Sequence, residues 1–128
     1  TALEWYRDLR LCKQVDNIDY VYDLDRLKRM YGYLSAHGDL YYIEYRGVLV
    51  GDIALKENGE ICLVICRDYQ NRHIGRRCVK NMLELAREKG MKRVQAEIYS
   101  FNEQSRKMFS SLGFEHTEED WYVLDMER

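Results

Sequence analysis

The sequence predicts an α+β fold: a single mixed β-sheet, made of an antiparallel meander plus one parallel crossover, flanked by helices. Three observations predict it. Residues 40–66 repeat with a period of two in three segments separated by turn residues. Residues 74–86 have a helical period, and residues 93–99 alternate again. Strand, helix and strand in this order form a right-handed crossover, which places the last strand parallel to the third.

Composition limits the class of protein. The chain has 128 residues, 46% of them hydrophobic, which suits one domain over residues 1–128. Its 20 basic and 22 acidic residues give a net charge of −2, which argues against a dedicated nucleic-acid binder. No apolar run reaches the roughly 20 residues of a membrane span, and no signal peptide opens the chain, so we expect a cytoplasmic protein with no membrane partner. The cysteines show no paired or zinc-type spacing, which predicts reduced thiols and no metal: Cys12, Cys62, Cys66 and Cys78.

Two helical patterns come first. Residues 3–12 carry apolar side chains on one side, and a second stripe ends at Gly38. Either Asp23 or Asp25 can cap the second helix. The residues of its stripe are Leu24, Leu27, Met30, Tyr31 and Leu34.

Three strands follow, with the sequences LYYIEYR, VLVGDIAL and EICLVIC. Arg46-Gly47 separates the first two, and Asn58-Gly59 predicts a two-residue hairpin turn before the third. The third strand, residues 61–66, is apolar on both faces. We therefore expect it to be central in the sheet and covered on both sides.

The rest of the chain completes the sheet. The crossover helix stops at Gly90, and a short helix runs from about Asn102 to Gly113. FEH and WYVLDM, near the end of the chain, predict a closing hairpin. The chain has no proline, repeat or low-complexity stretch, so we predict no domain boundary.

A basic loop, CRDYQNRHIGRR, joins the third strand to the crossover helix. The first turn of a helix leaves backbone N–H groups unpaired and carries the positive end of the helix dipole, so the loop predicts a phosphate site. Its basic side chains point to the same ligand. A run of like charge is also typical of a solvated helix face, so the loop does not decide the function by itself.

The order of these elements resembles the GNAT superfamily of acyl-CoA-dependent N-acetyltransferases. The family loop Q/R-x-x-G-x-G/A corresponds to residues 70–75, QNRHIG, and the later family pattern to residues 102–114, NEQSRKMFSSLGF. The opening ALEWYRD resembles the first helix of a RimJ/RimL-like branch, and by this resemblance we expect the family's first strand, which precedes that helix, to be missing from the sequence. His73 stands where the first loop glycine usually is, and Phe109 where many members carry a thiolate-protonating tyrosine.

The resemblance implies acetyl-CoA as co-substrate. Its pantetheine arm would pair with residues 63–66 like an added strand, and N–H groups at about residues 72–77 would bind the pyrophosphate. A backbone N–H around Val64 or Ile65 would bind the oxyanion. Asn102 as a helix cap and Phe109 as a core residue are compatible with this interpretation. The implied cofactor-binding residues are Leu63, Val64, Ile65, Cys66, Gln70, Asn71, Arg72, His73, Ile74, Gly75, Arg76, Arg77, Asn102, Ser105 and Phe109.

Acetyl transfer by direct attack on the thioester needs a neutral amine. Holding a lysine-type amine of pKa ~10.4 neutral at pH 7 costs about 4.6 kcal/mol, against about 1 kcal/mol for an α-amino group. Glu60, close to where several family members place a glutamate base, and Asp52 on the neighbouring strand are the candidate bases. Either carboxylate is equally compatible with a structural role at a turn or strand end. Tyr99, Ser100 or a water could replace the missing tyrosine as proton donor.

The predicted function is therefore that of an acetyl-CoA-dependent N-acetyltransferase acting on a small-molecule or peptide amine, as a monomer or homodimer. A CoA-binding regulatory module with little or no transferase activity is the second hypothesis. A small nucleic-acid-binding domain is the third, and its binding would weaken steeply with salt. That third function would use Arg72, Arg76, Arg77 and Lys80.

Overall fold

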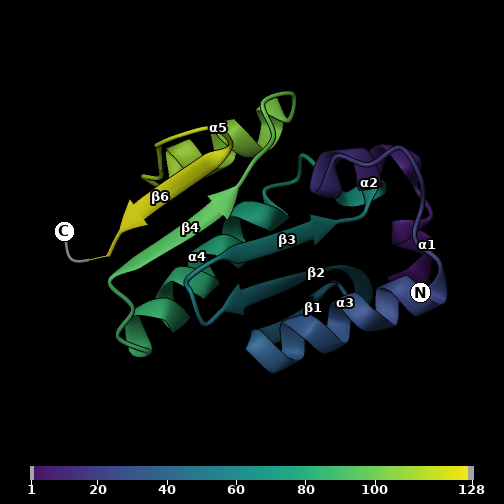
Figure 1. The fold of residues 1–128 in the computed structure, drawn as a ribbon, viewed down its shortest axis with the longest axis horizontal. Coiled ribbons are helices and arrows are strands. Elements are labelled where there is room, and N and C mark those ends of the chain that lie inside the picture. The colour runs from purple at the N-terminus through teal and green to yellow at the C-terminus, as the bar shows by residue number, and fades with distance from the viewer. Residues whose placement is uncertain (1, 127–128) are drawn as a thin grey trace.

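The computed structural model describes residues 2–126 as a twisted sheet with helices on both faces (Figure 1). Helix α4 lies behind the strands, and α3 lies on the opposite face. This arrangement confirms the predicted α+β fold. The elements in chain order are α1 (Ala2–Tyr6), α2 (Leu9–Asp16), α3 (Leu24–His37), β1 (Gly38–Tyr45), β2 (Val48–Lys56), β3 (Ile61–Ile65), the 3-10 turn η1 (Arg67–Tyr69), α4 (Ile74–Glu88), β4 (Arg93–Glu97), α5 (Glu103–Ser111), β5 (Glu115–His116) and β6 (Trp121–Asp125).

The predicted single helix over residues 3–12 is wrong, because the chain breaks between α1 and α2. Asp8 has extended backbone angles, and its carboxylate accepts a hydrogen bond from the backbone N–H of Arg10 at 3.0 Å. An aspartate in this geometry caps a new helix and ends the old one. Asp23, one of the two predicted caps, holds α3 in the same way through the N–H of Arg26 at 2.8 Å.

Strands β1, β2 and β3 form the predicted antiparallel meander. Arg46 and Gly47 both have positive φ, as a two-residue hairpin turn requires. The second turn differs from the prediction, because Lys56 pairs directly with Glu60 and leaves a three-residue loop. In that loop Gly59 alone takes the left-handed conformation, at φ 89°, and forms a bulge.

The second half of the chain follows the predicted order. Helix α4 crosses from β3 to β4, and Gly90 follows it with φ 75°. The closing hairpin is confirmed, since β5 pairs with β6 and His116 lies opposite Tyr122. Strand β6 lies between β4 and β5, antiparallel to both.

Strands β3 and β4 are parallel, as predicted, but they pair at one point only. The bridge joins Glu60 and Gln95, and the Gln95 N–H donates to the carbonyl of Gly59 at 2.9 Å. Beyond it the two strands diverge in Figure 1, so the sheet consists of two three-stranded halves. Strand β3 lies between β2 and β4, but within residues 2–126 most of its second edge pairs with no strand.

Each face of the first half-sheet has its own core. On the α4 side, Val79, Ala86 and Val94 are fully buried with Ile61. On the other face, α1, α2 and α3 bury Tyr6 and other apolar residues against Val64. Strand β3 is therefore covered on both faces, as its apolar sequence predicted.

Candidate active site

Where β3 and β4 diverge, the register of β3 decides which of its backbone groups point toward β4. Successive residues of an antiparallel strand direct their N–H and C=O groups alternately to opposite edges. The ladder with β2 includes Lys56 N–H to Glu60 O and Cys66 N–H to Val50 O, both at 2.8 Å. In this register, Val64 also faces β2. Leu63 and Ile65 therefore direct their backbone groups toward β4. We call the unpaired stretch between β3 and β4, beyond the bridge of Glu60 and Gln95, the opening.

This register corrects part of the predicted pantetheine contact. Leu63 and Ile65 face the opening, where both groups of Leu63 and the N–H of Ile65 can pair with an added strand, while the Ile65 carbonyl accepts from Gln70. The N–H of Cys66 donates to β2, and its carbonyl accepts from Tyr69 at 3.0 Å, so neither group is available. Val64 is likewise committed to β2, because it lies opposite Asp52 in the ladder. Of the two predicted oxyanion donors, only Ile65 is directed correctly.

The basic loop delivers the chain into α4 through two left-handed residues. Asn71 has φ 62° and His73 φ 63°, and His73 occupies the N-cap position. No side chain of residues 2–126 caps this helix end, and its first turn contains no acidic residue. The Arg77 N–H donates to the His73 carbonyl at 3.2 Å, so of the predicted pyrophosphate donors at residues 72–77 this one is already used. The N–H groups of residues 74–76 lie in the first turn of α4, where a helix leaves them without an internal partner.

The side chains of the loop are held in different ways. The Arg72 guanidinium lies 5.0 Å from the ring centroid of Tyr69 and is exposed. Arg77 is exposed as well, whereas the Nε of Arg76 donates to Ser111 Oγ of α5 at 3.2 Å. Arg72 and Arg77 are therefore the arginines of this loop that are most accessible to a phosphate.

Gly75 sets how closely α4 approaches β3. A Cβ at this position would lie 3.2 Å from Leu63 Cδ2, which is tighter than ordinary van der Waals contact. The missing side chain therefore brings the first turn of α4 close to the β3 residue that faces the opening. The sequence motif predicted a glycine role here, and the structure supplies its packing reason.

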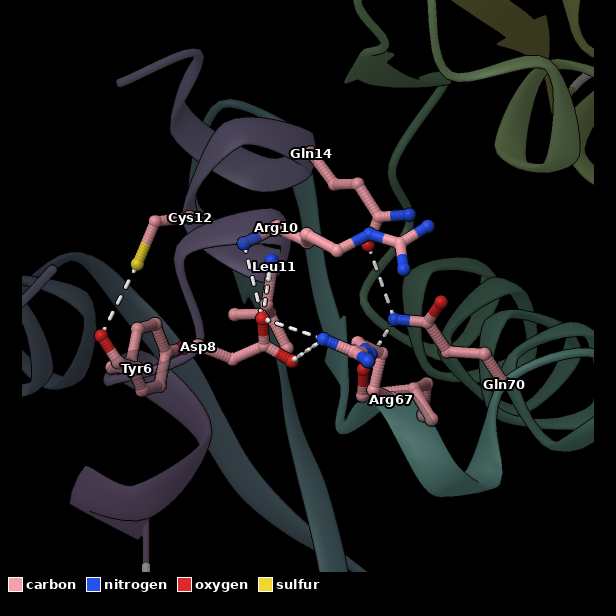
Figure 2. Close-up of polar contacts among 9 residues, drawn as sticks. Tyr6, Asp8, Arg10, Leu11, Cys12, Gln14, Arg67 and Gln70 are labelled. Carbon is pink, nitrogen blue, oxygen red and sulfur yellow. Dashed lines mark hydrogen bonds and ion pairs between the residues drawn. The ribbon is translucent and has the colours of Figure 1, made fainter. Parts of the chain in front are cut away.

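Gln70 holds the loop in place with its side chain, and its predicted contact with a cofactor stays a prediction. Its Nε2 donates to the Ile65 carbonyl at 2.9 Å and to Gln14 Oε1 at 3.1 Å, as Figure 2 shows. Nearby, the guanidinium of Arg67 lies 3.4 Å from both carboxylate oxygens of Asp8. Helix α2 is thus hydrogen-bonded to the loop through Gln14. The Ile65 carbonyl has a hydrogen-bond donor although no strand of residues 2–126 pairs with it at that edge.

Asp52 lies on the other side of the half-sheet, in β2, and is 3% exposed. The hydroxyls of Tyr6 and Tyr31 both donate to its Oδ2, each at 2.7 Å. Burial raises the pKa of Asp52 to about 6, and the hydrogen bonds from Tyr31 and Tyr6 oppose this rise. A carboxyl group with this pKa is mostly ionised at neutral pH and can still accept a proton.

Glu60, the other predicted base, lies at the closed end of the opening. It is four residues from Val64 along β3, which is about 13 Å in a strand. Its Oε1 forms an ion pair with Lys56 Nζ at 3.1 Å. Cys62 lies between the two carboxylates, and burial, followed by the charge of Glu60, raises the pKa of its thiol to about 12. Glu60 is therefore paired with a cation, whereas Asp52 is held by neutral donors.

Tyr99, the predicted proton donor, follows β4 at the open end. Its hydroxyl donates to Glu97 Oε1 at 3.4 Å, and its ring stacks on Phe101. Burial, together with the charge of Glu97, raises the pKa of Tyr99 to about 12. This phenol stays protonated at neutral pH but is a weak acid toward a thiolate whose conjugate pKa is ~8.5.

Helix α5 contacts the first turn of α4 through the hydrogen bond between Arg76 and Ser111. Asn102 caps the helix, since its Oδ1 accepts from the Ser105 N–H at 3.3 Å. Phe109 is 3% exposed and packs edge-on against Phe114 with centroids 5.0 Å apart. These contacts confirm the structural roles that the sequence allowed for Asn102 and Phe109. Contact of Asn102, Ser105 and Phe109 with a cofactor stays a prediction.

Two residues of the site were missed from the sequence. Tyr6 and Tyr31 lie in apolar helical patterns, which predict only a core position for each of them. They are 46 and 21 residues from Asp52 in the chain, and no local pattern links them to it. The only available signal was a phenolic hydroxyl at a core position, which needs a partner when buried.

Residues 2–126 contain no group of three or more His, Cys, Asp or Glu side chains that could hold a metal ion. The helices in this part of the chain are all too short or too polar to cross a membrane. All four cysteines have free thiols.

Known proteins share this arrangement. The chain superposes on a GNAT-family acetyltransferase from Bacillus anthracis with a TM-score of 0.82 at 16% identity, covering 99% of this chain and 88% of that one. A putative acetyltransferase from Salmonella typhimurium, solved with its cofactor acetyl-CoA, gives 0.77 at 18% identity over 98% and 87%. A GNAT acetyltransferase from Elizabethkingia anophelis with acetyl-CoA bound gives 0.68 at 15% identity over 90% and 87%.

No curated protein sequence matches the chain significantly. The family model described as the acetyltransferase (GNAT) family, however, matches residues 2–114, which include the first half-sheet, the basic loop and α5. With the divided sheet and the loop at the start of α4 in view, this match establishes that the chain belongs to the acetyltransferase (GNAT) family.

Proposed function

We propose that this protein transfers the acetyl group of acetyl-CoA to a primary amine by direct attack on the thioester. One observation carries the proposal: the backbone groups of Leu63 and Ile65 face an opening that begins beside the uncapped end of α4. A ligand with an extended amide-containing arm can pair with these backbone groups while its phosphates bind at the uncapped end of α4. Acetyl-CoA has both parts. The acetyl-CoA named with two of the similar structures gives independent support.

The cofactor contacts follow from this geometry. The pantetheine arm pairs with Leu63 and Ile65, and the pyrophosphate accepts hydrogen bonds from the N–H groups of residues 74–76. Arg72 and Arg77 are exposed at the loop and neutralise phosphate charge. Ser105 and Phe109 complete the far side of the site.

Asp52 is the base in this proposal. It takes a proton from the acceptor ammonium through water, since β3, about 5 Å from β2, lies between Asp52 and the opening. The neutral nitrogen then attacks the thioester carbon, and a β3 N–H in the opening, that of Leu63 or Ile65, binds the oxyanion. The C–N bond forms as the C–S bond breaks, and the thiolate leaves. A water, or more slowly Tyr99, returns a proton to the thiolate.

The acceptor belongs to the cationic amines. Asp52 and Glu60 lie on the face of the half-sheet opposite α4, and Glu97 extends the carboxylates across the opening. Burial raises the pKa of Glu97, and the charge of Glu60 adds to this effect. These carboxylates favour an ammonium group as it enters. A RimJ/RimL-like branch, a cytoplasmic location and a small-molecule or peptide acceptor stay predictions.

The test combines binding and turnover. Saturating acetyl-CoA should raise the melting temperature, because a ligand at a hundredfold excess over Kd adds about 2.7 kcal/mol to the stability of the native state. Thiol release should then appear with at least one member of a panel of polyamines, aminoglycosides, amino acids and peptides. Stabilisation without thiol release would favour the CoA-binding regulatory module. The absence of any melting shift would contradict the proposed function.

A further inference from the structure

We propose that Tyr6 and Tyr31 are positioning residues that hold Oδ2 of Asp52 and keep the carboxylate ionised, so that Oδ1 faces the acceptor amine. This inference rests on the proposed function, in which Asp52 is the base. Its starting point is geometric. Two hydroxyls from different helices donate to the same carboxylate oxygen, each at 2.7 Å, and do not occupy the other oxygen.

Tyr6 is the fixed side of this pair. Its side chain is fully buried. Its carbonyl accepts hydrogen bonds from the Tyr22 N–H at 2.9 Å and from Cys12 Sγ at 3.1 Å. Its ring packs on the ring of Tyr22 with centroids 4.8 Å apart. The backbone and ring of Tyr6 are thus held by α2 and by the segment before α3, which directs its hydroxyl toward Asp52.

Tyr31 is the outer side of the pair. It comes from α3 and is only partly buried, in contrast to Tyr6. Its ring meets Tyr6 and Tyr42 edge-on, at 6.4 and 5.9 Å between centroids. Tyr42 is the cross-strand neighbour of Asp52 in β1. The hydroxyl of Tyr31 is therefore directed by its own packing as well as by the carboxylate.

The surroundings of Asp52 make neutral donors necessary. The titratable groups around it are the phenols of Tyr6, Tyr31 and Tyr42 and the thiol of Cys62. A cation in their place would lower the pKa of the carboxyl group and weaken it as a base. Without any donor, burial would raise this pKa further. Two phenols limit the rise in the pKa of Asp52 and fix the orientation of its carboxylate without adding a charge.

The experiment compares hydroxyl deletions within one aromatic cluster. Tyr31→Phe, Tyr6→Phe and the double variant each remove donors to Asp52. Tyr22→Phe is the matched control, because the Tyr22 hydroxyl donates to Asp16 instead. The readouts are the acid limb of the kcat/KM profile, the titration of the Asp52 carboxyl carbon by NMR without substrate, and the melting temperature.

We expect each single deletion to move the acid limb and the NMR titration upward by about one pH unit, since a hydrogen bond to a charged group has roughly this strength. At pH 6 this lowers the rate about fivefold, and the loss should disappear near pH 9. In the double variant, the acid limb and the NMR titration should both lie at a higher pH than in either single variant. Tyr22→Phe should leave both titrations in place, even if it lowers the melting temperature.

Three results would overturn the inference, and they differ in what they say of the proposed function. Unmoved titrations in both single variants and the double variant, with Asp52→Asn inactive, would leave Asp52 as base and make the tyrosines structural. An equal shift in Tyr22→Phe would show general loosening of the cluster. Full activity of Asp52→Asn would remove Asp52 as base, and the positioning role with it.

Discussion

The two sides of the opening are built differently. On the α4 side, the loop at residues 70–76 is contiguous, partly exposed and basic, and its two left-handed residues are separated by one residue. On the opposite face, Asp52 is buried and held by tyrosines from two helices distant in the chain. The first side presents backbone N–H groups to an anion. The face that carries Asp52 buries a carboxylate whose hydrogen-bond donors, Tyr6 and Tyr31, are neutral.

This difference separates recognition from chemistry. Phosphate binding needs N–H groups and positive charge at a helix end, which a short segment can provide alone. A base with a raised pKa needs burial, and burial requires several elements to pack together. Variants on the two sides should therefore fail in different ways: the loop through cofactor affinity, and Asp52 through turnover.

The largest effect is expected for Asp52→Asn. Loss of the base should lower kcat/KM by about 10²–10⁴-fold with little change in the affinity for acetyl-CoA. Steady-state kinetics and calorimetric titration check the two parts. Glu60→Gln is the matched control, and it should retain activity because Glu60 is paired with Lys56. A greater loss in Glu60→Gln than in Asp52→Asn would reverse the assignment of the base.

Asp52→Asn should also be more stable than the unchanged protein at alkaline pH. The pKa of Asp52 is about 6 in the folded protein against 3.8 for the free group, so folding favours its protonated form. Stability from this preference is fully present below pH 3.8 and is lost as the pH rises through 6. At pH 8 the ionised carboxylate therefore costs up to roughly 3 kcal/mol, which the amide avoids. Urea unfolding should show the gain at pH 8 and none near pH 3.5; an equal gain at both would contradict the account.

The next effect is expected on the loop side. Reversing Arg72 and Arg77 together to Glu should weaken acetyl-CoA binding by about 10–100-fold, because each charge-assisted phosphate contact contributes around 1 kcal/mol or more. The melting temperature without ligand should change little, since both side chains are exposed. Arg87→Glu, on an exposed position in the last turn of α4, is the control. Equal loss of affinity in the control would mean that only overall charge matters.

The smallest effect is expected for His73→Gly. His73 has φ 63°, a conformation that costs an L-residue about 1 kcal/mol and glycine almost nothing. The greater freedom of glycine in the unfolded chain offsets part of this gain. We expect a melting temperature higher by a few °C at most. Arg72→Gly, at a residue without positive φ, should lower it, and a fall in both variants would contradict the strain at His73.

What could be predicted from the sequence follows the same division. Each strand and helix of the crossover was predictable, because hydrophobic period and turn residues act over a few positions. The loop was predictable because QNRHIG is contiguous. The break at Asp8 was missed, since an aspartate inside an apolar helical pattern does not reveal by itself that it caps a new helix.

The remaining misses depend on tertiary register. The single bridge between Glu60 and Gln95, and therefore the opening, depends on where β4 turns toward β6. The alternation that separates Leu63 and Ile65 from Val64 depends on pairing with β2. The tyrosine contacts of Asp52 depend on how the first helices pack on the sheet. None of these has a local signal in the sequence.

The central claim is that acetyl-CoA lies in the opening along β3, and amide hydrogen exchange tests it residue by residue. Val64 is the internal reference, because its N–H faces β2 with or without cofactor. We predict that saturating acetyl-CoA slows exchange at Leu63 and Ile65 relative to Val64. Unchanged relative rates at Leu63 and Ile65, at a concentration of acetyl-CoA that raises the melting temperature, would place the cofactor elsewhere and contradict the account.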